Sequence, residues 1–321
     1  MQKTNLPIIK FIPQFLNYLE IDQGLAPKSI ENYARFLNKF IFWLKQLKLS
    51  SLLPHELNDE YIYKYKTFLA HQNSSDKSAK PLKKTTQNYY LIALRNLLKY
   101  FSEKNIISLP ADKVNLLRDK DDKQIKFLTL AQIDQLLSSP TLDSLEGLRD
   151  KAILETFFST GLRVAELVSL DRDQIKIKQQ TEYLEIPIKG KGGRIRVIYF
   201  SPRSVRALKH YLNERKDMDK ALFISYSKNN AKSDNRRLSV RAVENIVKKY
   251  VKIAGLPVMM SPHSLRHSYA TDLLSNGVDL RLVQEFLGHR NIATTQVYTH
   301  VTNKQLREAH KKFHGGNKLS S

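Results

Sequence analysis

Apolar side chains recur every three or four positions over most of residues 9–48 and again from Thr85 to Tyr100. This spacing places them on one face of an α-helix, and lysines and arginines occupy much of the opposite face. Gly24 and Pro27 interrupt the first stretch, and Ser29 is expected to cap the helix that follows them. With a further helix in DEYIYKYKTFLAHQ, the pattern predicts an all-helical first module of four or five helices.

A change in composition separates this module from the rest of the chain. Residues 112–126 are dense in charge and poor in large apolar side chains, which is typical of a linker. We therefore expect a helical domain over residues 1–111 and a second domain over residues 127–321. Thr129 is expected to cap the first helix of that second domain, with Gln132 three residues later as its capping-box partner.

The second domain mixes helices with one pair of strands. LRDKAILETFFSTGLRVAELVSL predicts two helices joined at Gly161, and SPRSVRALKHYLNE and RAVENIVKKYVKIAG predict two more. Residues 261–310 are expected to be helical with breaks at Gly277 and Gly288. In TEYLEIPIKGKGGRIRVIYF two β-rich runs flank GKGG, which predicts a β-hairpin because glycine accepts the backbone angles of a tight turn. The fold class is therefore mainly α with a small β-sheet (α+β).

The charge balance points to a polyanionic partner. The chain has 53 lysines and arginines against 31 aspartates and glutamates, a net charge of +22. Residues 1–120 alone have 19 basic and 10 acidic side chains, so the surplus is not a basic tail on a neutral domain. Nucleic acid or an acidic membrane surface would attract such a chain.

Other features narrow the class further. The chain has no cysteine, which excludes disulfides, thiolate nucleophiles and cysteine-based metal sites. No apolar run is long enough to span a bilayer, and the N-terminal residues do not resemble a signal peptide. We therefore expect an intracellular protein of the cytoplasm that has no membrane partner.

Six side chains suited to phosphate chemistry follow one another in the second domain: Arg163, Lys191, His263, Arg266, His289 and Tyr298. Each has an ordinary explanation when taken alone. Arg163 can pair with Glu166 one turn later, and Lys191 can be a solvated hairpin tip. Either of the two histidines can pack or cap a helix, and Tyr298 is one of 15 tyrosines.

Together, the six fit phosphoryl transfer better than they fit these separate explanations. Cations can stabilise charge on the nonbridging oxygens, an acid can protonate the leaving oxygen, and a hydroxyl can attack. His263 and Arg266 are three residues apart and share a helix face, whereas the adjacent His267 is expected to point elsewhere. Three further cations near the hairpin are expected to contact phosphates: Lys189, Arg194 and Arg196. No paired-carboxylate metal site is evident, so we expect neither a metal ion nor another cofactor.

These segments resemble the motifs of the tyrosine recombinase (phage integrase) family, and of its Xer branch in particular. The matching motifs are TGLRVAEL, GKG, HSLRHSYATDLL and LGHRNIATTQVYTHV. YLEIDQGLAPKSIENYARFLNKFIFWL is similar to the family's SAM-like core-binding domain, and LREAHKKFH resembles the C-terminal helix of Xer proteins. The resemblance covers almost the whole chain.

The resemblance assigns a role to each of the six positions. Arg163 is similar to the first catalytic arginine, Lys191 to the hairpin lysine, and His263 and Arg266 to the H-x-x-R pair. His289 matches the second histidine and Tyr298 the nucleophile. Two departures are visible. The hairpin GKGGRIRVIYF lacks the second lysine and the strand-end proline of many Xer proteins, and Arg194 could replace that cation. The polar insert around residues 73–84 is longer than usual.

The resemblance implies a site-specific recombinase that cuts and rejoins duplex DNA through a 3′-phosphotyrosyl intermediate. Both basic domains would close on a DNA site with inverted repeats, with residues 112–126 as the hinge. Four protomers would assemble, as a homotetramer or with a paralogue, and a helix over residues 304–314 would dock on the next protomer. A FtsK-like translocase could activate the complex at the nucleoid, for chromosome dimer resolution or for integration and excision of a mobile element.

Three other classes of protein share part of the pattern. A type IB topoisomerase uses similar chemistry but relaxes supercoils without a specific site. A DNA-binding regulator with an inactive site would bind but not cleave. A basic RNA-binding or membrane-binding protein explains the charge but not the motifs. The N-terminal module and the tail favour recombination over relaxation.

Overall fold

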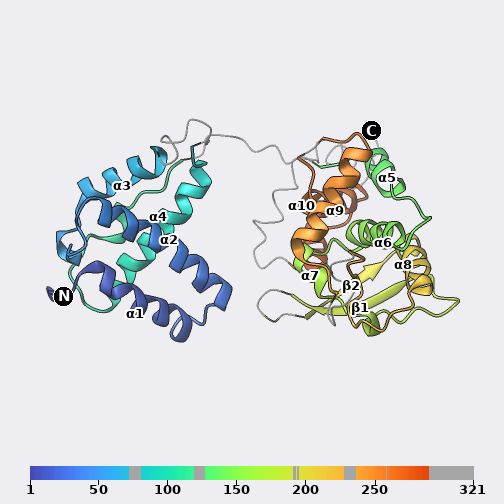
Figure 1. The fold of residues 1–321 in the computed structure, drawn as a ribbon, viewed down its shortest axis with the longest axis horizontal. Coiled ribbons are helices and arrows are strands. Elements are labelled where there is room, and N and C mark those ends of the chain that lie inside the picture. Colours follow the sequence, from blue (N-terminus) through green and yellow to red (C-terminus); the bar gives the residue numbers. More distant parts are fainter. Residues whose placement is uncertain are drawn as a thin grey trace, which may run out of the picture. The chain divides into compact units, whose positions relative to one another are not determined.

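The chain divides into two compact units, Met1–Asp122 and Lys123–Ser321. The computed structural model describes residues 1–71, 81–118, 127–190, 193, 195–227, 236–257 and 259–288. Each unit has its own apolar core. Helices dominate the described residues, which form a single two-stranded sheet (Figure 1). The expected fold class, mainly α with a small β-sheet, is therefore confirmed.

The described residues of the first unit form four α-helices: α1 (Ile8–Ile21), α2 (Pro27–Gln46), α3 (Asp59–His71) and α4 (Lys84–Glu103). The apolar faces predicted by the sequence meet in a core that contains Phe15, Phe40, Tyr65 and Phe101. The expectation of a Ser29 cap is wrong, because α2 begins two residues earlier. Proline suits the first helical position, since its ring fixes a helical φ and its missing N–H has no helical partner there.

The first unit extends past residue 111. The 3₁₀ turn η2 (Ala111–Lys113) follows α4, and the next residue, Val114, is fully buried in the first core. The side chain of Asn88 accepts a hydrogen bond from the Leu117 N–H at 2.8 Å and donates one to the Leu117 carbonyl at 3.0 Å. The early part of the expected linker therefore packs on the helical unit, while residues 119–126 lie outside the described residues.

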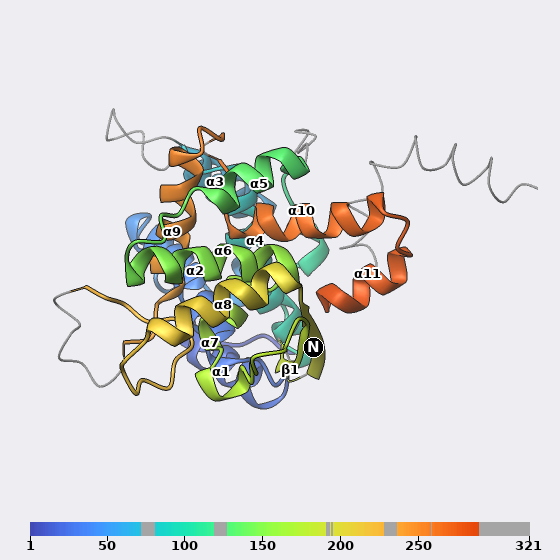
Figure 2. The ribbon, with the colours of Figure 1, turned by 90° about the vertical axis from the view of Figure 1, so that its right-hand side faces the viewer.

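The described residues of the second unit form helices and a β-hairpin. The α-helices and strands of its described residues are α5 (Leu130–Ser138), α6 (Leu145–Thr160), α7 (Val164–Ser169), β1 (Leu184–Lys189), β2 (Ile195–Phe200), α8 (Pro202–Glu214), α9 (Val240–Ile253), α10 (Pro262–Ser275) and α11 (Leu280–Leu287). Helix α6 is buried along most of its length and packs against α8 and α10, which flank it in Figure 2. The turn that precedes Arg163 therefore begins at the end of a helix that is held in the core.

Several local predictions are confirmed in the second unit. Thr129 caps α5 and forms the expected capping box with Gln132. The strands pair antiparallel, in register from Leu184 opposite Phe200 to Lys189 opposite Ile195. The hairpin buries one face, because Ile186, Ile188, Ile198 and Phe200 are covered while the intervening side chains are not.

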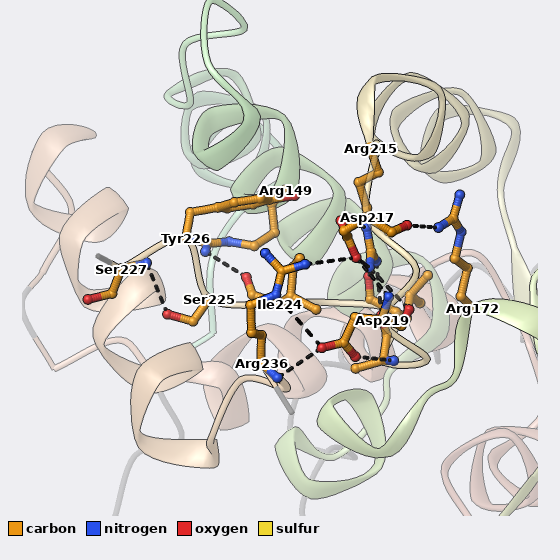
Figure 3. A network of polar contacts seen from close by, with 12 residues as sticks. Arg149, Arg172, Arg215, Asp217, Asp219, Ile224, Ser225, Tyr226, Ser227 and Arg236 are labelled. Atoms are coloured by element: carbon orange, nitrogen blue, oxygen red, sulfur yellow. Dashed lines mark hydrogen bonds and ion pairs between the residues drawn. The ribbon is translucent and has the colours of Figure 1, made fainter. Parts of the chain in front are cut away.

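A polar network orders the segment that follows α8 (Figure 3). The fully buried Arg215 side chain donates to the carbonyls of Ala221 at 2.9 Å and Leu222 at 2.7 Å, and it pairs with Asp217. The same carboxylate accepts from Arg236 at 3.1 Å. Buried carbonyls and a buried charge thereby satisfy one another, which fixes this irregular segment against the core.

Candidate active site

Arg163 is placed by the turn between α6 and α7. Gly161 ends α6 with a left-handed backbone (φ +59°), and Arg163 is the residue immediately before α7. A Cβ atom at Gly161 would lie 2.4 Å from the Tyr269 ring, so glycine is required both by the backbone angle and by the close approach of α10. This turn brings Arg163 beside the residues of α10.

Arg163 pairs with Glu166, which is one of the ordinary explanations that the sequence offered for this arginine. The Arg163 guanidinium donates to Glu166 Oε1 at 2.9 Å, and the Arg163 backbone N–H donates to Oε2 at 2.9 Å. The Glu166 side chain is 8% exposed and that of Arg163 is 35% exposed. The carboxylate is therefore buried beneath a guanidinium that still reaches solvent.

Arg266 connects the α10 motif to the α6–α7 turn. Its buried guanidinium donates from Nη1 to the Gly161 carbonyl at 2.5 Å and from Nη2 to the Leu287 carbonyl at 2.6 Å. Gly161 lies two residues before Arg163, so these contacts bring together two motifs that are about a hundred residues apart in sequence. Arg163 and Arg266 also donate to neighbouring backbone carbonyls at the end of α11.

His263 lies one turn before Arg266 on α10, as expected. The His267 ring is 4.1 Å from the His263 ring and edge-on to it, so the expectation that His267 points elsewhere is wrong. Residues four apart on a helix are neighbours, which explains the contact. The His263 ring reaches the surface, but partial desolvation, followed by the charges of Arg266 and Arg163, lowers its pKa from the ordinary value. The imidazole is therefore neutral at pH 7 and able to accept a proton.

The hairpin contributes cations of two kinds. Lys189 ends β1 and is exposed. Arg196, which was expected to contact phosphate, has a side chain only 11% exposed and forms a bidentate ion pair with Glu166, at 3.0 and 2.7 Å. The buried Glu166 carboxylate needs a compensating charge. Arg196 supplies one because the second position of β2 faces Glu166. Arg194 and Lys191 lie outside the described residues.

Three arginines donate to the last carbonyls of α11. Arg196 Nε donates at 3.2 Å, Arg266 at 2.6 Å and Arg163 at 3.4 Å. The negative end of the helix dipole favours these cations, and the carbonyls there have no partner within the helix. In chain order, the accepting residues are Phe286, Leu287 and Gly288. The predicted site residue His289 follows Gly288 directly, Tyr298 comes later in the chain, and both lie outside the described residues.

The central position of Glu166 and the role of the carbonyls at the end of α11 were not predicted from the sequence. Only the spacing of Arg163 and Glu166 gave a local signal, because Arg196 is 30 residues away from Glu166 and backbone carbonyls have no side-chain signature. Within the described residues, no group of three or more histidines, aspartates or glutamates could hold a metal ion. No helix of the described part is long and apolar enough to cross a membrane.

Comparison with known proteins finds similarity over nearly the full length of the chain. Residues 126–305 match the model of the phage integrase family, and residues 12–105 match that of the phage integrase N-terminal SAM-like domain. The tyrosine recombinase XerC of Thermodesulfovibrio yellowstonii is 34% identical over 307 residues, which cover 95% of this chain and 96% of that protein. XerD of Lacticaseibacillus casei is 32% identical over 310 residues, covering 94% and 98% of the two chains.

A solved structure shares the fold at lower identity. The XerH site-specific recombinase, in a post-cleavage complex with palindromic difH substrate, matches with a TM-score of 0.72 and 22% identity, over 96% of this chain and 97% of that one. The chain belongs to the phage integrase, or tyrosine recombinase, family, whose members cleave and rejoin DNA through a phosphotyrosine intermediate. Within that family it is a Xer-like site-specific recombinase.

Proposed function

We propose that this chain cuts each strand of a duplex recombination site with Tyr298 and rejoins it to a partner strand. The observation that supports the proposal most directly is the bond from Arg266 to the Gly161 carbonyl, two residues from Arg163. It brings two guanidinium groups to one place, where the partly exposed Arg163 can donate to a phosphate and the buried Arg266 adds positive charge beside it. Loss of either arginine is expected to cost about 3–4 kcal/mol of transition-state stabilisation, by analogy with loss of an oxyanion donor.

The proposed step is an in-line displacement at phosphorus. The Tyr298 hydroxyl attacks, a bond forms between its oxygen and phosphorus, and the bond from phosphorus to the 5′ oxygen breaks. Tyrosine ionises near pH 10 in water, so it needs a base, and neutral His263 accepts its proton. Lys191 protonates the departing 5′ oxygen, and His289 donates a hydrogen bond to a nonbridging oxygen. The new ester retains the phosphodiester energy, and attack by a 5′ hydroxyl of the partner strand reverses the step.

The proposed substrate is duplex DNA with an inverted repeat. Positive charge in both units supports contacts to the DNA backbone from each of them. The exposed Lys189 would contact a phosphate near the cleavage site, and so would Arg194, which lies outside the described residues. The proposal is supported by two structures of similar fold, the XerH recombinase bound to palindromic difH substrate and the Tn1549 integrase in complex with a circular intermediate DNA. The same chemistry serves chromosome dimer resolution and movement of a mobile element, at the nucleoid in the cytoplasm.

The proposed assembly is a tetramer, made of one chain or of this chain and a paralogue. Recombination of two sites needs four cleavages, and a cyclic head-to-tail contact closes a ring of four. A helix over residues 304–314 would make that contact on the next protomer, and a FtsK-like translocase would control it. No metal ion or other cofactor enters the proposed reaction.

Trapping of the covalent intermediate tests the nucleophile. A duplex selected by the protein from a random pool is nicked beside the cleavage point, so that the released fragment diffuses away and the phosphotyrosyl adduct accumulates. Tyr298→Phe should give no adduct above background while binding the duplex as the wild type does. Adducts formed by Tyr298→Phe would contradict the assignment. Relaxation of a supercoiled plasmid that lacks the selected site would instead favour a topoisomerase.

A further inference from the structure

Arg196 has its donors directed into the protein, beside the proposed phosphate site. It is the second residue of β2, and its guanidinium donates to both oxygens of Glu166 and to the Phe286 carbonyl. With a side chain 11% exposed and bonds from all three of its nitrogens, the guanidinium is in the wrong state for a phosphate contact. It instead connects three elements: the hairpin, α7 and the end of α11.

The partner that Arg196 shares with Arg163 is a single carboxylate. Each oxygen of Glu166 accepts one bond from the Arg196 guanidinium and one from Arg163, which uses its Nη1 and its backbone N–H. Burial would raise the pKa of Glu166, but hydrogen bonds from Arg196 and Arg163 hold it at about 2. The carboxylate is therefore ionised at every working pH, and its charge is divided between two guanidinium groups.

The end of α11 is shaped to fit Arg196. Gly288 has a left-handed backbone (φ +62°), and a Cβ atom there would lie 2.9 Å from Arg196 Cδ and 3.1 Å from its Nη1. The glycine thus serves two purposes, since it ends the helix and lets the guanidinium approach. A side chain at position 288 would push Arg196 away from Glu166.

We propose that Arg196 is a positioning residue, which holds Glu166 so that the Arg163 guanidinium keeps donors free for the scissile phosphate. Without Arg196, the buried carboxylate has one cation left, and it would draw both terminal nitrogens of Arg163 into a bidentate pair of its own. Arg163 would then be turned away from the phosphate. The inference rests on the proposed role of Arg163 and adds a residue that acts on it through Glu166.

The test compares two substrates that differ only in the scissile group. One nicked duplex carries the ordinary phosphate, and the other carries a racemic methylphosphonate, in which a methyl group replaces one charged nonbridging oxygen. The uncharged group needs less cationic stabilisation, so a variant that lacks a functional Arg163 should be impaired less on it. Single-turnover cleavage rates of both substrates are measured for the wild type, Arg163→Ala, Arg196→Gln and Arg196→Lys.

We expect Arg196→Gln to cleave the phosphate substrate on the order of 100-fold more slowly than the wild type. Its deficit on the methylphosphonate should be at least tenfold smaller, in parallel with that of Arg163→Ala. Arg196→Lys should recover part of the rate, because an ammonium keeps the charge but cannot bind both carboxylate oxygens and the Phe286 carbonyl in one plane. The double variant Arg163→Ala/Arg196→Gln should be no slower than Arg163→Ala alone.

Controls separate this proposal from instability and from failure of the proposed function. Arg203→Gln removes an arginine of the same unit that pairs with Glu155 and Asp134, and it should cleave both substrates at wild-type rates. Thermal unfolding identifies the temperature at which all variants are folded. If Arg196→Gln or Arg196→Lys, tested there, shows equal deficits on both substrates while the deficit of Arg163→Ala shrinks, the positioning role is refuted. If the deficit of Arg163→Ala is also unchanged, the proposed role of Arg163 itself fails.

Discussion

His263 shows how single side chains are tuned by their immediate surroundings. The His267 ring contacts the His263 ring, and the charges of Arg266 and Arg163 act on it. Desolvation, followed by these two positive charges, lowers the pKa of His263. The pKa of His267 falls further, to about 4, because of burial and of the charges of His263 and Arg266. Two adjacent imidazoles are thus kept neutral, which suits a base toward a tyrosine hydroxyl.

This electrostatic arrangement predicts the acid side of the pH profile. Protonation of His263 removes the base, so cleavage should decline only when the pH falls below its lowered pKa. We expect the acid limb of kcat/KM, which reports the free enzyme, to lie below pH 6.5, the ordinary histidine value. Cleavage of the nicked duplex at subsaturating DNA, from pH 4.5 to 8, measures it. His263→Gln should be slower and lack this limb, and a wild-type limb at or above pH 6.5 would contradict the assignment.

The turns that end α6 and α9 differ in what surrounds them. Gly161 and Gly255 both have left-handed backbone angles, φ +59° and +62°. A Cβ atom at Gly161 would collide with the Tyr269 ring, whereas one at Gly255 would meet nothing within 4 Å. Glycine is therefore required at position 161 by both the packing and the backbone angle, and at position 255 by the backbone angle alone.

This pair yields a matched stability prediction. Gly255→Ala should lower the free energy of unfolding by about 1 kcal/mol, the cost of a left-handed alanine. Gly161→Ala should lower it by roughly 2–4 kcal/mol, because displacement of the Tyr269 ring is added. Urea unfolding of both variants, followed by circular dichroism, gives the difference. Equal losses would mean that α10 moves aside at no cost, and that the turn does not fix the position of Arg163 against Arg266.

Local signals allowed the sequence to predict much of these elements. The Thr129 capping box, the glycine at the end of α6 and the GKGG hairpin all depend on residues a few positions apart, and all are confirmed. Ser29 does not cap α2, because the helix already begins at Pro27.

The long-range part of the site could not be predicted in this way. Arg196 resembles a phosphate contact in sequence, because it lies in a basic hairpin. Only the fold brings Glu166 against it, and only the fold places the Arg266 guanidinium on the carbonyls of Gly161 and Leu287. Such contacts depend on how distant elements pack, and backbone acceptors leave no trace in the residue types.

The distribution of charge along the chain indicates which side chains contribute to DNA affinity. The surplus of +22 is shared by both units, so neither unit alone accounts for attraction to a polyanion. Some basic side chains have all their partners within the protein. Arg215, for example, donates to two carbonyls and pairs with an aspartate. Others, such as Lys189, remain exposed. The affinity for DNA should therefore depend on the second kind and not on the first.

Salt dependence distinguishes these two kinds of cation directly. The logarithm of the association constant for duplex DNA should fall linearly with the logarithm of the salt concentration, by about 0.9 for each phosphate neutralised. Lys189→Gln removes an exposed cation and should make the slope shallower by about 1, with weaker binding at low salt. Arg203→Gln removes a charge that is already paired with the buried Glu155 and with Asp134, and it should leave the slope unchanged. Fluorescence anisotropy with a labelled duplex between 50 and 200 mM KCl provides the measurement. A slope that changes with Arg203 but not with Lys189 would contradict both assignments, because the ion-paired arginine would then contact DNA and the strand-end lysine would not.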